Sequence, residues 1–137
     1  MGSLDSKRGW GHALDYVEGM WRILHHSEPD DFVLATGEAR LIREFATAAF
    51  AAASIEIEWR GSGLQEVAVR AGTDDVVIEV DPCNIPPAEV DLLVGDSSKA
   101  RRILEWKPQI PFREIVAEMV EADLAAIQSE ADRGRDV

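Results

Sequence analysis

A short glycine-containing loop that leads directly into a helix constrains this chain more than any other feature. The loop is Lys7–Gly11, and it carries a cationic pair, an aromatic residue and two glycines. From His12 to about His26, apolar residues recur at helical spacing, which predicts a helix with one apolar face. Only six residues precede the loop, and the chain contains no Gly-x-Gly-x-x-Gly fingerprint. We therefore expect no opening βαβ unit and no complete Rossmann domain.

The rest of the sequence predicts a mixed α/β chain of short strands and about four helices. Pro29 ends the first helix. The apolar run Phe32–Ala35 predicts a strand buried on both faces, and the alternation of Ile55–Trp59 predicts a half-exposed strand. The other expected elements in the middle of the chain are a helix over 41–53, strands over 67–69 and 76–80 joined by a hairpin loop at Gly72–Asp75, and an extended loop over 81–87. Near the C-terminus we expect a short helix that Ser97 or Ser98 can cap and that runs to about Leu104, and a helix over 112–131 with a buried stripe of Ile115, Val116, Met119, Val120, Leu124 and Ile127. We expect one region over residues 1–131 and a frayed tail over residues 132–137.

Charge and composition exclude several classes of partner. The 137 residues are 46% hydrophobic, as in a globular protein, and carry a formal net charge of -12. That charge argues against nucleic acid and against anionic membrane surfaces as partners. Cys83 is the only cysteine, so neither an internal disulfide nor a cysteine-based metal site can form. No apolar run is long enough to span a bilayer and no signal-peptide pattern opens the chain, so we expect a cytoplasmic protein.

Four ordered blocks of the sequence resemble the GDP-mannose 4,6-dehydratases, which are extended short-chain dehydrogenase/reductase enzymes. The match runs from about Gly2 to about Asp123. The blocks are Gly2–Val17 with its Trp10-Gly11-His12 core, Phe32–Glu38 followed by Arg43–Phe45, Pro87–Asp91 with Gly95-Asp96, and Leu104–Pro108 with Phe112 and 118–123. The resemblance implies an α/β fold that is only part of the extended fold: the substrate-binding C-terminal region without the N-terminal Rossmann half.

The resemblance also implies a GDP-mannose site built on Arg8 and Glu89. In the family, the arginine before Trp-Gly-His contacts the diphosphate and the glutamate binds the guanosine ribose. On the residues alone, Arg8 is a solvated surface group or a phosphate contact, and Glu89 is equally well a surface carboxylate. The chain departs from the family pattern at Gly9 (usually Asp), Asn84 (Tyr) and Pro86 (Arg). Losing the arginine contact would weaken diphosphate binding by roughly 1.5–3 kcal/mol.

Other candidate residues receive structural interpretations. His25-His26 ends a helix, where imidazolium favours the negative end of the dipole, and no third ligand at zinc-like spacing accompanies any histidine. His12 begins the first helix and is given a structural role. The two glycines, Gly9 and Gly11, would let the backbone approach a ligand closely. No metal site is expected.

Catalysis by this chain alone is not expected. The family reaction uses NADP, a Tyr-x-x-x-Lys pair, a Thr or Ser and a Glu, all of which lie upstream of the first matching block. Tyr16 is the only tyrosine and is followed by Met20 at the lysine position. We therefore predict no catalytic residue and no cofactor-binding residue here, and no NADP binding by the chain alone.

Two hypotheses of different classes remain open. The first is the GDP-sugar-binding portion of a GDP-mannose 4,6-dehydratase, with weak binding of GDP or GDP-mannose. The second is a non-catalytic truncated remnant or interaction module with weak or no nucleotide-sugar binding. By resemblance, the first helix and the Phe32 segment pack against the nucleotide domain. Their apolar faces are then expected to be exposed here, which predicts self-association or a Rossmann partner encoded by a split gene.

Overall fold

The computed structural model describes residues 1–85 and 94–133, which form a mixed α/β arrangement of small sheets and helices. The strands are β1 (Lys7–Arg8), β2 (Arg40–Leu41), β3 (Ile57–Arg60), β4 (Val67–Arg70) and β5 (Val76–Glu79). The helices are α1 (Ala13–Leu24), α2 (Ile42–Ala52), α3 (Ser98–Ile103) and α4 (Phe112–Arg133), with 3₁₀ turns at Gly63–Gln65 and Pro82–Asn84. The fold class expected from the sequence is confirmed, and each predicted helix is present.

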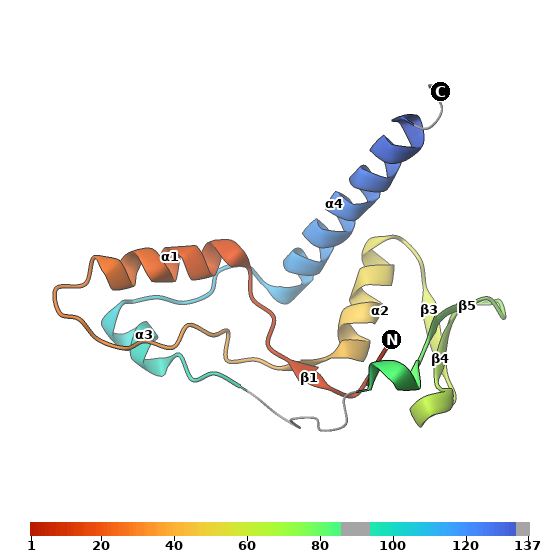
Figure 1. The fold of residues 1–137 in the computed structure, drawn as a ribbon, viewed down its shortest axis with the longest axis horizontal. Coiled ribbons are helices and arrows are strands. Elements are labelled where there is room, and N and C mark those ends of the chain that lie inside the picture. The colour runs from red at the N-terminus through yellow and green to blue at the C-terminus, as the bar shows by residue number, and fades with distance from the viewer. Residues whose placement is uncertain (86–93, 134–137) are drawn as a thin grey trace.

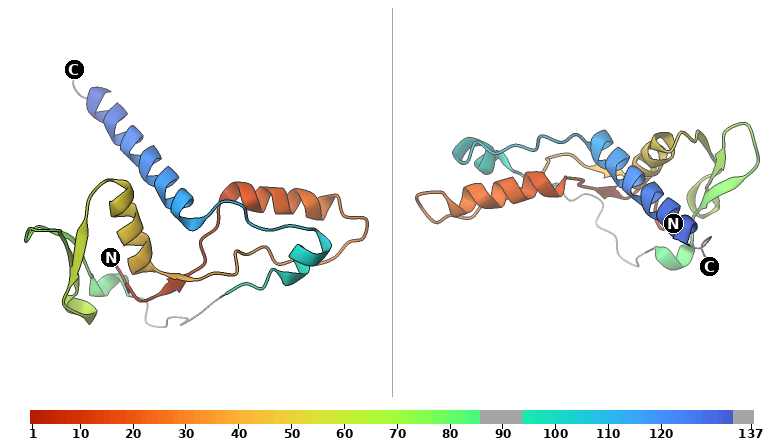
Figure 2. Two further views of the ribbon diagram at one scale, coloured as in Figure 1. Left: turned by 180° about the vertical axis from the view of Figure 1, so that it is seen from behind. Right: turned by 90° about the horizontal axis from the view of Figure 1, so that it is seen from above.

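The elements separate into two ends joined by the β1–β2 ladder. Figure 1 shows α1 and α3 at one end, α2 with the β3–β5 sheet at the other, and α4 extending away from both. The view from behind in Figure 2 shows the same separation. Because β1 precedes α1 and β2 precedes α2, the ladder lies where the chain enters each end.

At the sheet end, α2 covers an antiparallel sheet of order β3-β4-β5. Gly72, with φ +75°, takes the left-handed conformation in the β4–β5 hairpin, as the predicted loop requires. A buried group that we call the sheet cluster lies between helix and sheet; it contains Ala46, Ala68 and Ile78, with Phe50, Ile57, Trp59 and Val77 packed against it. The alternating apolar residues of β3 and β4 supply its sheet side.

The N-terminal segment closes the sheet end. The backbone amides of Ile42 and Arg43 donate to the carbonyls of Ser6 and Leu4 (3.0 and 3.1 Å), which fixes the segment along the start of α2. Leu4 is 3% exposed. The Arg43 guanidinium donates to Glu66 and to Asp5 Oδ1 (2.8 Å) and lies over the Trp59 ring. These bonds hold the pKa of Arg43 above its ordinary value, with Glu66 the larger cause and Asp5 the second.

At the other end, α1 and α3 enclose what we call the Trp106 cluster. It contains Ala100, Leu104 and Trp106, with Tyr16, Ile23, Phe32 and Leu34 packed against it. Asp15 is 7% exposed and accepts hydrogen bonds from the amides of Gln109 and Ile110 (3.0 and 3.1 Å), while Trp106 Nε1 donates to the Asp15 carbonyl (2.7 Å). The helix start and the Trp-Lys-Pro block therefore meet in space.

The predicted strand over Phe32–Ala35 is wrong. The segment has no strand assignment, and within the described ranges no strand pairs with it. Phe32 and Leu34 pack on the Trp106 cluster, whereas Val33 is 52% exposed. A run that is apolar at every position indicates burial on two faces, but the extended segment here has a packing partner on one.

Three predictions for α3 and α4 also need correction: the buried stripe of α4, the end of α4 and the cap of α3. In α4 only Ile115 and Val116 of the expected stripe are buried, and Met119, Leu124 and Ile127 are 47%, 51% and 63% exposed, because the helix leaves the body of the molecule. The helix continues to Arg133, so residues 132 and 133 of the expected tail are helical and 134–137 lie outside the described residues. Neither Ser97 nor Ser98 caps α3 with its side chain; the carboxylate of Asp96 accepts from Ser98 N (2.8 Å) instead.

Candidate functional site

The β1–β2 ladder sets two arginines directly opposite each other. Its register pairs Arg8 with Arg40 and Lys7 with Leu41. Side chains of directly opposed residues in an antiparallel pair lie on the same face, so Arg8 and Arg40 share one face and Lys7 lies on the other. Arg8 is exposed, and its Nη1 donates to the Lys7 carbonyl (2.9 Å). The best sequence candidate for a phosphate contact is thus on a strand end fixed by pairing.

An aromatic stack holds the loop after β1. Trp10 stacks on Phe45 of α2 with ring centroids 4.3 Å apart, and Phe45 meets the Phe112 ring edge-on at 6.1 Å. The Arg40 guanidinium lies 4.9 Å from the Phe112 ring centroid, within the range of a cation–π contact. The loop, β2, α2 and α4 therefore meet at Trp10.

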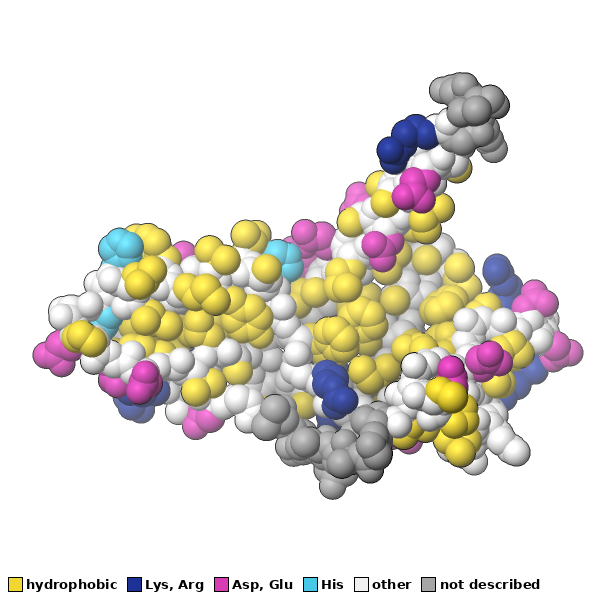
Figure 3. Space-filling view, viewed as in Figure 1, with side chains coloured by type: hydrophobic (Ala, Val, Ile, Leu, Met, Phe, Trp, Pro, Cys, Tyr) yellow, Lys and Arg dark blue, Asp and Glu magenta, His cyan; other side chains and the backbone are white. Residues whose placement is uncertain are grey.

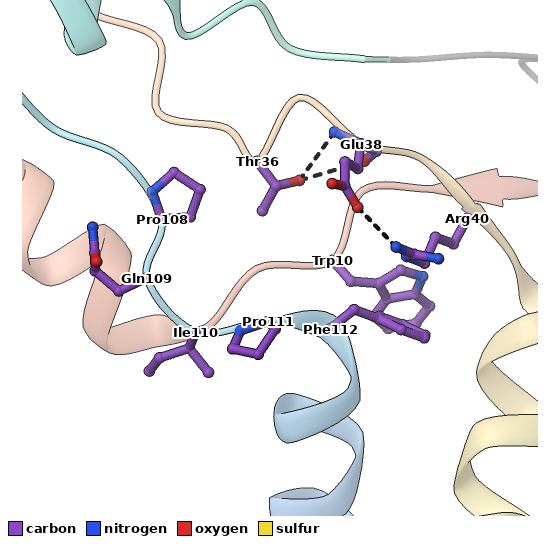
Figure 4. A pocket seen from close by; sticks show the side chains of 9 residues that line it. All are labelled: Trp10, Thr36, Glu38, Arg40, Pro108, Gln109, Ile110, Pro111 and Phe112. Carbon is purple, nitrogen blue, oxygen red and sulfur yellow. Dashed lines mark hydrogen bonds and ion pairs between the residues drawn. The ribbon is translucent and has the colours of Figure 1, made fainter.

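A cavity of about 210 Å³ opens beside this stack (Figure 4). Trp10, Thr36, Glu38, Arg40 and the 108–112 segment line it. Glu38 Oε2 accepts from Arg40 Nη2 (2.9 Å). Two donors here, Trp10 Nε1 and Arg40 Nε, are buried without a hydrogen-bond partner among the residues described. An unmet buried donor costs about 1–3 kcal/mol, so this corner of the molecule has unused capacity for an acceptor.

The two loop glycines differ in what they do. A Cβ on Gly11 would overlap the Tyr16 hydroxyl and lie 2.6 Å from Cζ, so this glycine is required by the packing of Tyr16 and its close approach is to the chain itself. A Cβ on Gly9 would make only an ordinary contact of 3.6 Å with the Glu38 carbonyl. The expectation that Gly11 makes room for a ligand is therefore replaced by an internal packing role.

His12 has the structural role expected from its position. Its Nδ1 accepts from Leu14 N (3.1 Å) and so caps α1, and its Nε2 lies 2.9 Å from Glu118 Oε2 of α4. At the other end of α1, His25 Nδ1 lies 2.8 Å from the Trp21 carbonyl. Over residues 1–85 and 94–133, no group of three or more metal-ligating side chains comes together.

The second predicted site residue, Glu89, lies outside the described residues, as does Pro86. Asn84 is described: its Nδ2 donates to Asp81 Oδ2 (3.1 Å), and its carbonyl lies against Gly2. The 81–85 turn thus begins beside the N-terminal segment that leads to β1. Sequence reasoning missed Arg40 and Glu38, because strand pairing is what brings their segment alongside Arg8.

Comparison with solved structures defines the class. RMD from Pseudomonas aeruginosa complexed with NADPH superposes with a TM-score of 0.65 at 18% identity, covering 88% of this chain and 34% of that chain. WbmG from Bordetella bronchiseptica in complex with NAD and UDP gives a TM-score of 0.63 at 20% identity, covering 91% and 35%. The fold is a partial extended short-chain dehydrogenase/reductase fold.

Sequence comparison gives the family. The family model described as GDP-mannose 4,6 dehydratase matches residues 1–119, and the chain belongs to this family. It is 51% identical over 124 residues to the GDP-mannose 4,6 dehydratase of Drosophila melanogaster, covering 90% of this chain and 31% of the relative. The Homo sapiens relative is 46% identical over 129 residues, with 94% and 35% covered. The chain thus spans about a third of the length of the curated relatives it matches. Among the helices described, none combines the length and apolarity needed to cross a membrane.

Proposed function

We propose that this chain supplies GDP-sugar-binding residues of a GDP-mannose 4,6-dehydratase, with Arg8 contacting the diphosphate of GDP-mannose. The observation that carries the proposal is the placement of Arg8: it is exposed, on a strand paired with β2, and followed by a loop fixed through Trp10 and Phe45. A guanidinium held on a paired strand loses less freedom on binding phosphate than one on a mobile loop. Glu89 is proposed as the ribose contact.

The complete reaction of the family converts GDP-mannose to GDP-4-dehydro-6-deoxy-mannose and water, and a bound NADP would take up a hydride from the sugar and then return it. We propose that this chain positions the nucleotide while the cofactor and the catalytic groups belong to other parts of the enzyme. Tyr16 supports this division, because its ring stacks 6.3 Å from Trp106 and its hydroxyl packs against Gly11. The chain alone is therefore expected not to turn over GDP-mannose.

The outer face of α1 is proposed as the contact surface for the cofactor-binding part of the enzyme. Its large apolar residues are Leu14, Val17, Met20, Trp21 and Leu24, which are 55–81% exposed. Figure 3 shows hydrophobic side chains gathered over the α1 end of the molecule. The chain spans about a third of its relatives' length, so most of the enzyme remains to cover this face. In isolation, a second copy of the chain is expected to cover it.

Calorimetry with GDP tests the nucleotide site. We expect millimolar or tighter binding, weakened about 10- to 100-fold by Arg8→Gln, which is the size expected for one charge-assisted contact. Lys7→Gln is the matched control, because Lys7 is the neighbouring cation on the opposite face of the ladder. Absence of GDP binding, or equal effects of the two variants, would favour the interaction-module hypothesis. Clear formation of the 4-keto-6-deoxy product from GDP-mannose and NADP would refute the division of catalytic roles.

Sedimentation velocity tests the α1 surface. Wild-type chain is expected to self-associate at micromolar concentration, and Val17→Glu is expected to shift the distribution toward monomer. Leu64→Glu is the control, since Leu64 is equally exposed (59% against 58% for Val17) but lies at the sheet end. A stable wild-type monomer would argue against the proposed contact surface.

A further inference from the structure

We propose that Arg40 is a second diphosphate-binding residue, which together with Arg8 forms a two-arginine clamp across the β1–β2 ladder. The inference rests on the proposed function, because it assigns a new residue to the same nucleotide-sugar site. The occupant is the diphosphate group itself, whichever base or sugar it carries.

Strand register places the two guanidinium groups on one face. Arg8 and Arg40 are directly opposed, and neighbouring strands lie roughly 5 Å apart. A diphosphate carries two negatively charged phosphoryl groups, so it can engage two cations at once, and each fork can bind phosphate oxygens in a bidentate manner.

The surroundings of Arg40 suit a ligand contact better than a fixed structural ion pair. Its side chain is 40% exposed, and its carboxylate partner Glu38 is 67% exposed. Its Nε is buried without a partner in the described part of the chain, so the hydrogen-bonding capacity of the guanidinium is incompletely used. Phe112 supports the guanidinium from one side at 4.9 Å and limits the directions in which it can turn.

Arg43, three residues later, shows what a structural arginine looks like in this chain. Its side chain is 24% exposed, and it bonds both oxygens of Glu66, which is nearly buried, as well as Asp5. Arg40 has one exposed carboxylate that a stronger anion can displace. Glu38 is therefore expected to compete with the ligand, holding Arg40 in place when the site is empty.

Binding of inorganic pyrophosphate, GDP and guanosine to the full chain tests the clamp. Arg40→Gln is expected to weaken pyrophosphate and GDP by about 10- to 100-fold and to leave any guanosine binding unchanged. Glu38→Gln is expected to tighten pyrophosphate binding, and this gain should disappear in the double variant Glu38→Gln/Arg40→Gln, whereas a general loss of negative charge would tighten binding in both backgrounds. Arg60→Gln is the matched control: its side chain is 45% exposed and pairs with exposed carboxylates at the sheet end.

The outcomes separate this inference from the function on which it rests. If Arg8→Gln weakens GDP while both Arg40→Gln and Arg40→Lys bind as wild type, the clamp is wrong and the Arg8 site survives. If no variant changes binding, or nothing binds, both fail. Arg40→Lys keeps the charge and the aliphatic stem, so it is expected to fold and to bind pyrophosphate with intermediate affinity. If Arg40→Gln melts at a lower temperature than wild type, the affinity of Arg40→Lys for pyrophosphate tests the clamp in its place.

Discussion

The two ends of the molecule have buried clusters of similar size but differ in what covers them. The sheet cluster lies between α2 and three strands, and the N-terminal segment closes it. Among the residues that the structure describes, the Trp106 cluster is packed by α1, α3 and an extended segment. The outer face of α1 is apolar and exposed, whereas the large exposed apolar residues of the sheet and its loops are Leu64 and Val76. Helical periodicity alone therefore does not distinguish a face that packs within this chain from one that stays exposed.

Each end of the molecule contains a buried carboxylate that bonds to a segment distant in the sequence, and the two carboxylates have different kinds of partner. Asp15 accepts from backbone amides, while Glu66 pairs with the Arg43 guanidinium. The first arrangement fixes a turn against a helix; the second joins α2, the sheet and the N-terminal segment through one charge. Substitutions at the two ends should therefore destabilise the fold for different reasons: lost packing and backbone hydrogen bonds at the α1 end, and an unpaired charge at the sheet end.

The largest expected effect is at the centre of the Trp106 cluster. Trp106→Ala should destabilise the fold by about 3–5 kcal/mol, because a side chain that is 1% exposed leaves a cavity and an unpaired Asp15 carbonyl. Trp21→Ala, on the outer face of α1, should cost no more than about 0.5 kcal/mol in dilute monomer, since Trp21 is 55% exposed. Urea denaturation at low protein concentration measures both. Similar losses of unfolding free energy in the two variants would mean that the outer face of α1 is packed against other residues in solution.

A smaller effect is expected at the sheet end. Glu66→Gln should cost about 2–3 kcal/mol, because it leaves the Arg43 charge with only Asp5 as partner, in a site less buried than those where such losses reach about 3–5 kcal/mol. Asp74→Asn, which removes a fully exposed partner of Arg60, should leave stability nearly unchanged, because water and salt screen such a pair. A double-mutant cycle of Arg43→Met and Glu66→Met tests the pair: the double variant should lose much less than the sum of the two single variants, because neither charge is then left without the other. Additive losses in this cycle would show that the ion pair does not couple the two elements.

The loop glycines give the next comparison. Gly11→Ala should destabilise by about 1–2 kcal/mol, because the new methyl group displaces Tyr16 from its place beside Trp106. Gly9→Ala should be neutral to within about 0.5 kcal/mol. Adding Tyr16→Phe to Gly11→Ala should restore only part of the loss, since the Tyr16 Cζ position would still lie 2.6 Å from the methyl group. Thermal melts of the four proteins measure this, and equal melting temperatures for the two alanine variants would contradict the packing role of Gly11.

The sequence was most informative where a signal is local. Helical periodicity located α1, α2 and α4, and the turn residues around Gly72 located the β4–β5 hairpin, because these features depend on neighbours a few residues away. The ordered blocks led to the family, since they are long and keep their spacing. The Phe32–Ala35 error has the opposite cause: a strand needs a hydrogen-bonding neighbour, and a run of apolar residues does not contain that information.

The candidate site was predictable only in part. Arg8 could be proposed because the Trp10-Gly11-His12 sequence beside it identified its block. Arg40 could not be, because its position opposite Arg8 depends on pairing between segments more than thirty residues apart. A glycine at position 11 predicts a close contact with the backbone, but the sequence does not identify the group that makes it. The structure shows that this group is the Tyr16 side chain.

The smallest effect tests the tip of the α1 end, where Asp30 follows α1 and Lys99 lies on α3. Lys99 Nζ donates to Asp30 Oδ1 (2.6 Å), and this bond, followed by the Asp31 amide, holds the pKa of Asp30 below its ordinary 3.8. A lowered pKa means that Asp30 contributes stability above about pH 4, which is lost as the pH falls through the folded-state value.

Lys99→Met should raise the Asp30 pKa toward 3.8 and remove this acid-sensitive contribution, as carboxyl-carbon NMR titration would show. Asp96 is the internal control: the Ser98 amide is the main cause of its lowered pKa, so its titration should not move. An unchanged Asp30 titration in Lys99→Met would mean that the α1 and α3 tips are not joined in solution.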